Sequence, residues 1–142
     1  CPGLEPCHNF NRIIERCQDD EDLLVAHCDD AACTSATTST IDSTGTVGWY
    51  TSITIGADGL GLISYLDFTN GVLKVAHCSN TACTSATTST IDSTGNVGYD
   101  TSISITIGVD GLGLISYRDF NNGFLKVAHC DNTFCSPYFR RR

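Results

Sequence analysis

Basic residues are scarce in this sequence, and methionine is absent. Lys and Arg number 8 among 142 residues, against 16 Asp and Glu, and the formal net charge is −8. Such an acidic balance argues against a polyanionic partner, so we predict no nucleic-acid binding. No apolar run approaches the roughly 18 residues of a membrane-spanning helix, and we predict no membrane span. The length suits a single domain with one core.

Cysteine, by contrast, is abundant. Nine cysteines occur, at spacings that recur along the chain. A cytosolic protein seldom keeps so many thiols without a metal or redox motif, because its compartment is reducing. The cysteine content therefore predicts a secreted protein that resides in the extracellular space or at the cell surface.

The chain is built from copies of one segment. Residues Thr51–Cys83 read TSITIGADGLGLISYLDFTNGVLKVAHCSNTAC, and residues 101–135 repeat them as TSISITIGVDGLGLISYRDFNNGFLKVAHCDNTFC. The block ACTSATTSTIDSTG occurs at Ala32–Gly45 and again at Ala82–Gly95, and VAHC occurs three times. The periods of 50 and 52 residues lie in the range of propeller blades and solenoid coils. We expect a repeat fold.

Alternating residues and turn signals predict four short strands in each unit. The pairs Asp58-Gly59 and Asn70-Gly71 predict tight turns, because both residue types tolerate positive φ. In the complete unit the expected strands are Thr51–Gly56, Leu60–Tyr65, Val72–Cys78 and Thr87–Thr94. The second copy of the first strand is longer by two residues, a change that leaves every side chain on its own face of a strand. The predicted fold class is all-β, with antiparallel four-stranded meander repeats.

These units define the expected domain organisation. Residues 1–22 form a divergent N-terminal segment or adaptor, for which a divergent strand is favoured over a short helix ending at Arg16. Residues 23–142 form the repeat domain, with a partial unit at 23–48, a full unit at 49–98 and a partial unit at 99–142.

Six cysteines recur as C-x4-C pairs, each between the third and fourth strands of a unit. Facing residues of paired antiparallel strands lie at a distance that suits a disulfide, and a metal site is the competing interpretation. The C-x4-C spacing lacks the usual two-residue knuckle, so disulfides are favoured and no metal is predicted. The predicted pairs are Cys28–Cys33, Cys78–Cys83 and Cys130–Cys135. Cys1, Cys7 and Cys17 remain, so one of them is free, modified or bonded to another chain.

The repeat resembles the tandem β-propeller repeats of secreted bacterial proteins, over Leu23 to Cys135. The segments Ser64–Gly71 and Ser116–Gly123 look like the Asp-box hairpins of sialidases and of propeller lectins. Their Asp stands one position later than in S-x-D-x-G-x-x-W, and the closing Trp is missing. The resemblance therefore implies blade-like sheets in an incomplete ring, without sialidase chemistry, since one full and two partial units cannot close a ring of about four to eight blades.

Two hairpins carry candidate sugar-binding residues, in which a tyrosine ring would stack on a pyranose and polar groups would bind its hydroxyls. The alternative is that Asp and Asn-Gly serve the turn itself. The candidates are Tyr65, Asp67, Asn70, Tyr117, Asp119 and Asn122. Three histidines at equivalent positions are expected to be buried and hydrogen-bonded rather than ligands. They are His27, His77 and His129.

The predicted function is structural. The partial units leave open strand edges, and such edges invite pairing with another chain, so we expect self-association into a filament or a ring. The alternative is a carbohydrate-binding, lectin-like propeller module that gains avidity from several shallow sites. No residue pattern predicts an enzyme. The spacing of Cys1, Cys7 and His8 departs from that of a haem attachment site, and no cofactor is predicted.

Overall fold

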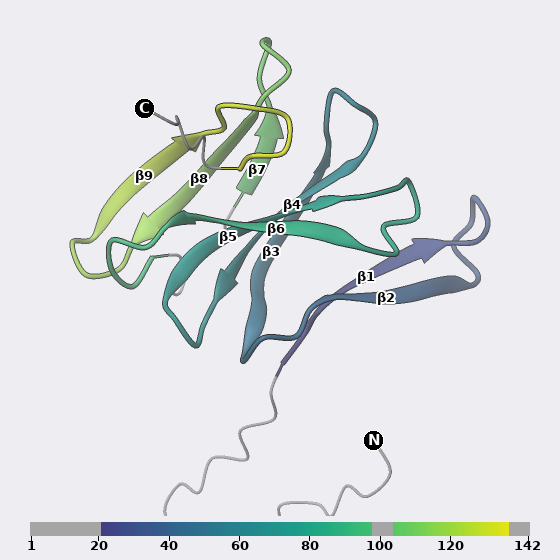
Figure 1. Cartoon of the computed structure of the whole chain (residues 1–142), viewed down its shortest axis with the longest axis horizontal. Coiled ribbons are helices and arrows are strands. Elements are labelled where there is room, and N and C mark those ends of the chain that lie inside the picture. The colour runs from purple at the N-terminus through teal and green to yellow at the C-terminus, as the bar shows by residue number, and fades with distance from the viewer. Residues whose placement is uncertain (1–20, 98–103, 137–142) are drawn as a thin grey trace, which may run out of the picture.

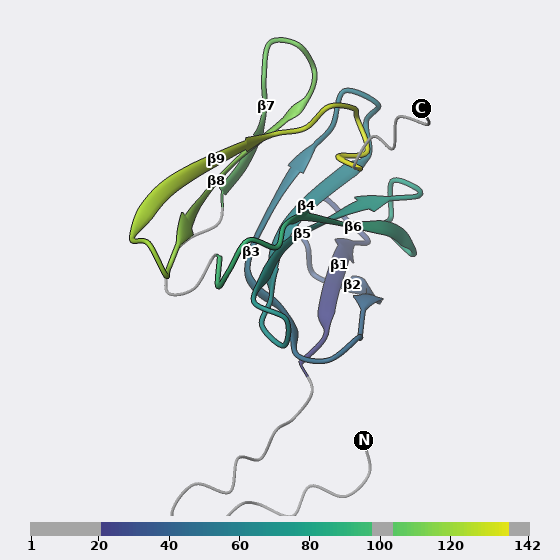
Figure 2. The ribbon, with the colours of Figure 1, turned by 60° about the vertical axis from the view of Figure 1, so that its left-hand side comes forward.

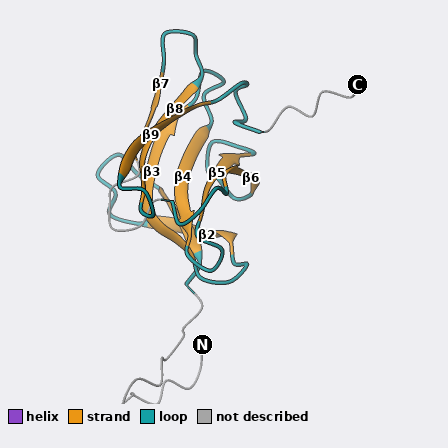
Figure 3. Cartoon of the chain, turned by 90° about the vertical axis from the view of Figure 1, so that its left-hand side faces the viewer, coloured by secondary structure: helices purple, strands orange, loops and turns teal. Residues whose placement is uncertain are grey.

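The computed structural model describes residues 21–97 and 104–136, which contain β-strands and no helix (Figure 1). The strands are β1 (Leu23–Cys28), β2 (Ala36–Asp42), β3 (Val47–Ile55), β4 (Gly61–Asp67), β5 (Val72–Cys78), β6 (Ala86–Asp92), β7 (Ser104–Ile107), β8 (Gly113–Asp119) and β9 (Phe124–His129). Apart from these strands, the described chain consists of turns and loops (Figure 3). The prediction of an all-β fold is confirmed.

The strands form three antiparallel sheets. The first sheet pairs β1 with β2, the middle sheet has the order β3-β4-β5-β6, and the last sheet has the order β7-β8-β9. Only the middle sheet is the complete four-stranded meander expected from the sequence. Within the described residues, the first sheet holds the third and fourth strands of a unit, and the last sheet holds the first three. No closed ring is formed by the described part of the chain.

Strand boundaries agree with the sequence patterns where turns delimit them. The third strand of the full unit runs over Val72–Cys78, as predicted. The first strand begins at Val47, four residues before the expected Thr51, because β3 contains two register shifts around Trp49 that interrupt its alternation. Residues 1–20, for which a divergent strand or adaptor is expected rather than a short helix, lie outside the described residues, and so do Cys1, Cys7 and Cys17.

The three sheets are stacked face to face, with the middle sheet between the other two (Figure 2). One hydrophobic core lies between the first and middle sheets, and the other lies between the middle and last sheets. The first core contains Leu23, Val47, Ile63, Tyr65, Ala76, Cys78 and Cys83. The second contains Leu62, Leu66, Leu73, Val75, Val97, Ile105, Ile115, Tyr117, Cys130 and Cys135. Because both its faces are covered, β4 is buried along its whole length.

Each unit carries a disulfide-closed loop. Cys28–Cys33, Cys78–Cys83 and Cys130–Cys135 lie at bonding distance, with Cα atoms 4.8, 4.9 and 4.7 Å apart. The predicted pairs are therefore confirmed. The last disulfide packs closely over β8, since a Cβ added to Gly113 would lie 2.8 Å from Cys130 Sγ. Glycine is required at this position because the sulfur occupies the space of a side chain.

Candidate functional site

A buried polar cluster joins the first sheet to the middle sheet. Asp42, at the end of β2, accepts a hydrogen bond from Tyr65 Oη at 2.7 Å, and its carboxylate lies 2.5 Å from Lys74 Nζ. The side chain of Asp42 is 6 % exposed and that of Lys74 is 13 % exposed. Burial by itself would raise the pKa of Asp42, but the hydrogen bonds from Lys74 and Tyr65 outweigh it and hold the pKa below its ordinary value. The carboxylate is therefore charged and paired.

The same cluster recurs between the middle and last sheets. Asp92 of β6 accepts a hydrogen bond from Tyr117 Oη at 2.7 Å and pairs with Lys126. Burial opposes ionisation of Asp92, yet the hydrogen bonds from Lys126, Thr94 and Tyr117 together place its pKa well below the ordinary value. Both sheet interfaces thus contain one Asp from the preceding unit and one Tyr-Lys pair from the following unit.

The tyrosines of these clusters stay protonated at any physiological pH. Burial and the facing carboxylate raise the pKa of Tyr65 far above its ordinary value, and the same two causes act on Tyr117. Each hydroxyl therefore keeps its proton and donates it in a hydrogen bond to an aspartate. Each phenol is neutral and buried, and its hydrogen bond is a structural contact between sheets that leaves no proton to donate to a ligand.

The six residues considered for sugar binding are divided by the structure into buried and exposed groups. Both tyrosines are buried, at 0 % and 4 % exposure, so neither ring has an exposed face on which a sugar could stack. The aspartates are buried as well: Asp67 accepts hydrogen bonds from the backbone and side chain of Asn70, and Asp119 accepts the same pair from Asn122. Each Asp-Asn pair therefore closes its own turn, while both asparagines remain exposed.

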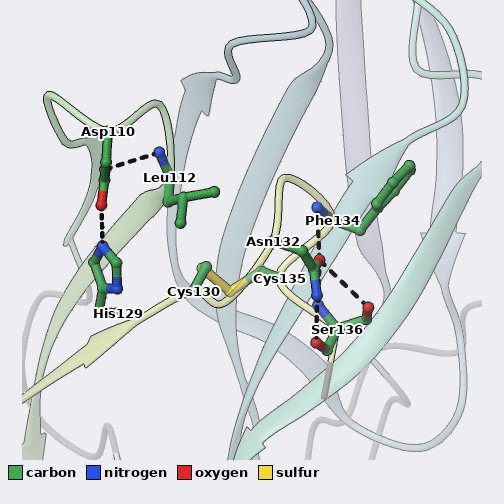
Figure 4. Close-up of a disulfide and its surroundings, with 8 residues drawn as sticks. All are labelled: Asp110, Leu112, His129, Cys130, Asn132, Phe134, Cys135 and Ser136. Carbon is green, nitrogen blue, oxygen red and sulfur yellow. Dashed lines mark hydrogen bonds and ion pairs between the residues drawn. A yellow bond between two sulfur atoms is a disulfide. The ribbon is translucent and has the colours of Figure 1, made fainter. Parts of the chain in front are cut away.

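The three equivalent histidines have different surroundings. His77 is buried, and its Nε2 lies 2.7 Å from Asp58 Oδ2 in the preceding hairpin, as expected for a structural histidine. His129 makes the same contact with Asp110 at 2.6 Å, but its side chain is 48 % exposed (Figure 4). His27 is exposed. The prediction of burial thus holds only for the histidine of the middle sheet.

The loop beyond β9 is organised by one asparagine. Asn132 Oδ1 accepts hydrogen bonds from the backbone N–H groups of Phe134 and Ser136, at 3.0 and 3.2 Å (Figure 4). The Phe134 ring extends to the middle sheet and packs against His77, with ring centroids 4.6 Å apart. The disulfide loop of the last sheet therefore packs against the end of β5, an inner strand of the middle sheet.

The outer face of the last sheet is apolar and uncovered. Leu125 is 79 % exposed and Val127 is 59 % exposed, whereas Leu73 and Val75, their equivalents in the middle sheet, are both 0 % exposed. Leu114 on β8 follows the same pattern, at 37 % against 1 % for Leu62. Sequence periodicity placed Leu73 and Val75 on one face but gave no signal of which copy would be covered.

The outer face of the first sheet is uncovered too, and it is different in character. Leu24, Ala26 and Cys28 of β1 point away from the middle sheet and are exposed. Their equivalents in the middle sheet are Lys74, Ala76 and Cys78, and the last two of these are fully buried. The described chain therefore ends in two unlike faces.

Each end also has an open strand edge with a groove beside it. Within the described residues β1 pairs only with β2, and β9 pairs only with β8. A groove of about 200 Å³ follows β1 and is bordered by Ile53, which is 58 % exposed, although the equivalent Ile105 is 6 % exposed. A second groove of about 240 Å³ lies between β6 and the end of β9, beside Ile91 and Ala128. These two ends are the candidate functional site.

No family model matches this chain. Neither a curated protein nor a solved structure matches it significantly. The resemblance to propeller repeats therefore stays a prediction from the quoted residues, and the function has to be argued from the geometry of the two ends.

Two further observations concern the described residues alone. They contain no cluster of three or more His, Cys, Asp or Glu side chains that would hold a metal ion. They also contain no helix long and apolar enough to cross a bilayer.

Proposed function

We propose that this chain is a secreted, non-enzymatic structural protein that self-assembles through its open ends into a filament or a ring. Its sheets act as propeller-like blades, and each chain supplies one complete blade and parts of two others. The three disulfides suit an extracellular protein, because such bonds persist in oxidising surroundings.

The observation that carries this proposal is the exposure of a face that is core elsewhere in the same chain. Leu125 and Val127 stand at positions where Leu73 and Val75 pack against a neighbouring sheet. Burial of one large aliphatic side chain contributes about 1.5–3 kcal/mol. An apolar sheet face with an open edge beside it is typical of an interaction surface.

The contact at such a face decides the shape of the assembly. A face that packs on a different face of the next copy repeats the same rotation at every step. The assembly becomes a ring if the rotation closes and a filament if it does not. The open edges of β1 and β9 provide backbone groups for further pairing along the same contact.

The sugar-binding alternative receives no support from the geometry. The two tyrosine rings that would stack on a pyranose are buried between sheets. Glycan binding by the exposed Asn70 and Asn122 stays a prediction, and retention on immobilised glycans with elution by free sugar tests it.

The size of the purified chain tests the proposed function. Light scattering over a range of concentrations, with negative-stain imaging, is carried out on the wild type, on Leu125→Asp and on Val109→Asp. Val109 is fully exposed at the β7–β8 hairpin, away from either end face, and gives a matched apolar-to-acidic control. We expect large particles for the wild type and the control and small ones for Leu125→Asp. A wild type that is monomeric at every concentration would overturn the proposal.

A further inference from the structure

The internal sheet interfaces each have two unlike halves. One half is a leucine-valine face, made by Leu73 and Val75 of the middle sheet. The other half is a disulfide face, on which Ala128 and the buried Cys130 of the last sheet pack against that leucine-valine face. The interface between the first and middle sheets has the same plan, with Leu23 and Val25 on Ala76 and Cys78.

The two uncovered faces of the chain are one of each half. The last sheet exposes a leucine-valine face, formed by Leu114, Leu125 and Val127. The first sheet exposes a disulfide face, formed by Leu24, Ala26 and Cys28. Every contact between sheets inside the chain joins one kind of face to the other, and within the described residues neither kind packs on its own kind.

The charges of the internal interfaces are missing from both uncovered faces. Inside the chain, an aspartate at the end of the fourth strand lies in the same sheet as the leucine-valine face. It pairs with a lysine on the disulfide face of the next sheet, as Asp92 does with Lys126. On the first sheet this lysine position is occupied by Leu24, which is 56 % exposed. The described part of the last sheet has no strand equivalent to β6, and so no aspartate at the matching place. Joining the two faces would bury neither a lone lysine nor a lone aspartate, which is the costly outcome for a sheet interface.

We propose that chains join head to tail: the leucine-valine face of the last sheet in one copy packs on the disulfide face of the first sheet in a second copy. The proposal rests on the proposed function and adds which surface meets which. Leu24 replaces the lysine of the internal interfaces because its position faces an apolar surface between chains. Arg118 stands where the middle sheet has the buried Leu66 and lies 5.6 Å from the Phe120 ring, so the contact between chains differs from the internal interfaces at this position.

Two variants block one face each. Ala26→Asp places a carboxylate on the disulfide face, and Val127→Asp places one on the leucine-valine face. Both residues are exposed within a single chain, so the fold of the monomer is retained, and circular dichroism with thermal unfolding verifies this. Should either variant unfold, Ala26→Lys and Leu125→Asp replace them. Val109→Asp serves as the control.

Head-to-tail contact gives a distinctive result on mixing. Each blocked variant alone should be monomeric by light scattering at concentrations where the wild type and the control form large particles. A 1:1 mixture should form a dimer with one copy of each variant and nothing larger, because only one intact pair of faces remains. Native mass spectrometry of variants that differ in mass identifies the composition of that dimer.

Two outcomes overturn the inference while leaving the proposed function in place. One is an Ala26→Asp variant that assembles like the wild type, which would show that the disulfide face takes no part. The other is a mixture that stays monomeric although each variant has lost assembly. A monomeric wild type would overturn the proposed function itself, and the inference with it.

Discussion

The middle and last sheets place nearly the same residues in opposite surroundings. LKVAHC at 73–78 is covered on both faces, whereas LKVAHC at 125–130 is covered on one face only. Leu73 and Leu125 occupy equivalent positions in equally paired strands, yet their exposures are 0 % and 79 %. Local sequence therefore determines the strand and the direction of each side chain, while the neighbouring sheet determines whether a face is core or surface.

The largest expected difference between the two copies comes from truncating these leucines. Leu73→Ala should lower the free energy of unfolding by about 2–5 kcal/mol, because it leaves a cavity in the core between the middle and last sheets. Leu125→Ala should change it by no more than about 0.5 kcal/mol in dilute protein, where assembly does not contribute. Urea unfolding at low concentration measures both. Equal losses at the two positions would contradict the comparison.

Removal of a disulfide should also depend on the sheet. The loops of Cys28–Cys33 and Cys78–Cys83 have the same length, so replacing either pair by alanine loses about 2 kcal/mol from loop closure. Cys78 and Cys83 are buried under the first sheet, so removing their sulfur atoms also leaves a cavity. This cavity should lower the free energy of unfolding by about a further 1–2 kcal/mol. Thermal unfolding of the two double variants in non-reducing buffer should show the lower melting temperature for the middle pair.

Acid should weaken the internal interfaces. The folded-state pKa values of Asp42 and Asp92 are depressed, so their stabilisation is present above the unfolded-state pKa of about 3.9 and is lost as the pH falls through the folded-state values. We expect the free energy of unfolding to fall by about 1–3 kcal/mol below about pH 4, from the loss of charged hydrogen bonds. Asp42→Asn should make this fall smaller, whereas Asp131→Asn, at an exposed position, should reproduce the wild-type profile in acid unfolding followed by circular dichroism.

The smallest expected difference concerns the histidines. His77→Ala should cost about 1–2 kcal/mol, because His77 is buried and its contact with Asp58 is lost. His129→Ala should stay within about 0.5 kcal/mol, since half of its side chain already faces solvent. Urea unfolding of the two variants measures this pair. A cost at His129 equal to that at His77 would show that the His-Asp contact stabilises the hairpin independently of burial.

Sequence analysis predicted the features that arise within one unit. The strand Val72–Cys78 and the three disulfide loops follow from local alternation, turn residues and spacing. The contacts between units were missed, because Tyr65 bonds to Asp42 across 23 residues and into another sheet. A signal existed: the same Tyr-Lys pair recurs at Tyr117 and Lys126, and Leu24 breaks the pattern. Interpreting it required knowing that the units stack face to face.

The Asp-Lys pairs have a consequence for folding. Near-identical neighbouring repeats tend to misassemble, because one copy can take the place of another. In one such error, the leucine-valine face of the middle sheet would dock on the outer, disulfide face of the first sheet. Asp92 would then be buried against Leu24, where no lysine is present to pair with it. This out-of-order packing of the repeats is therefore less stable than the native order. A single difference between copies, leucine in place of lysine, is enough to distinguish the first sheet from the others.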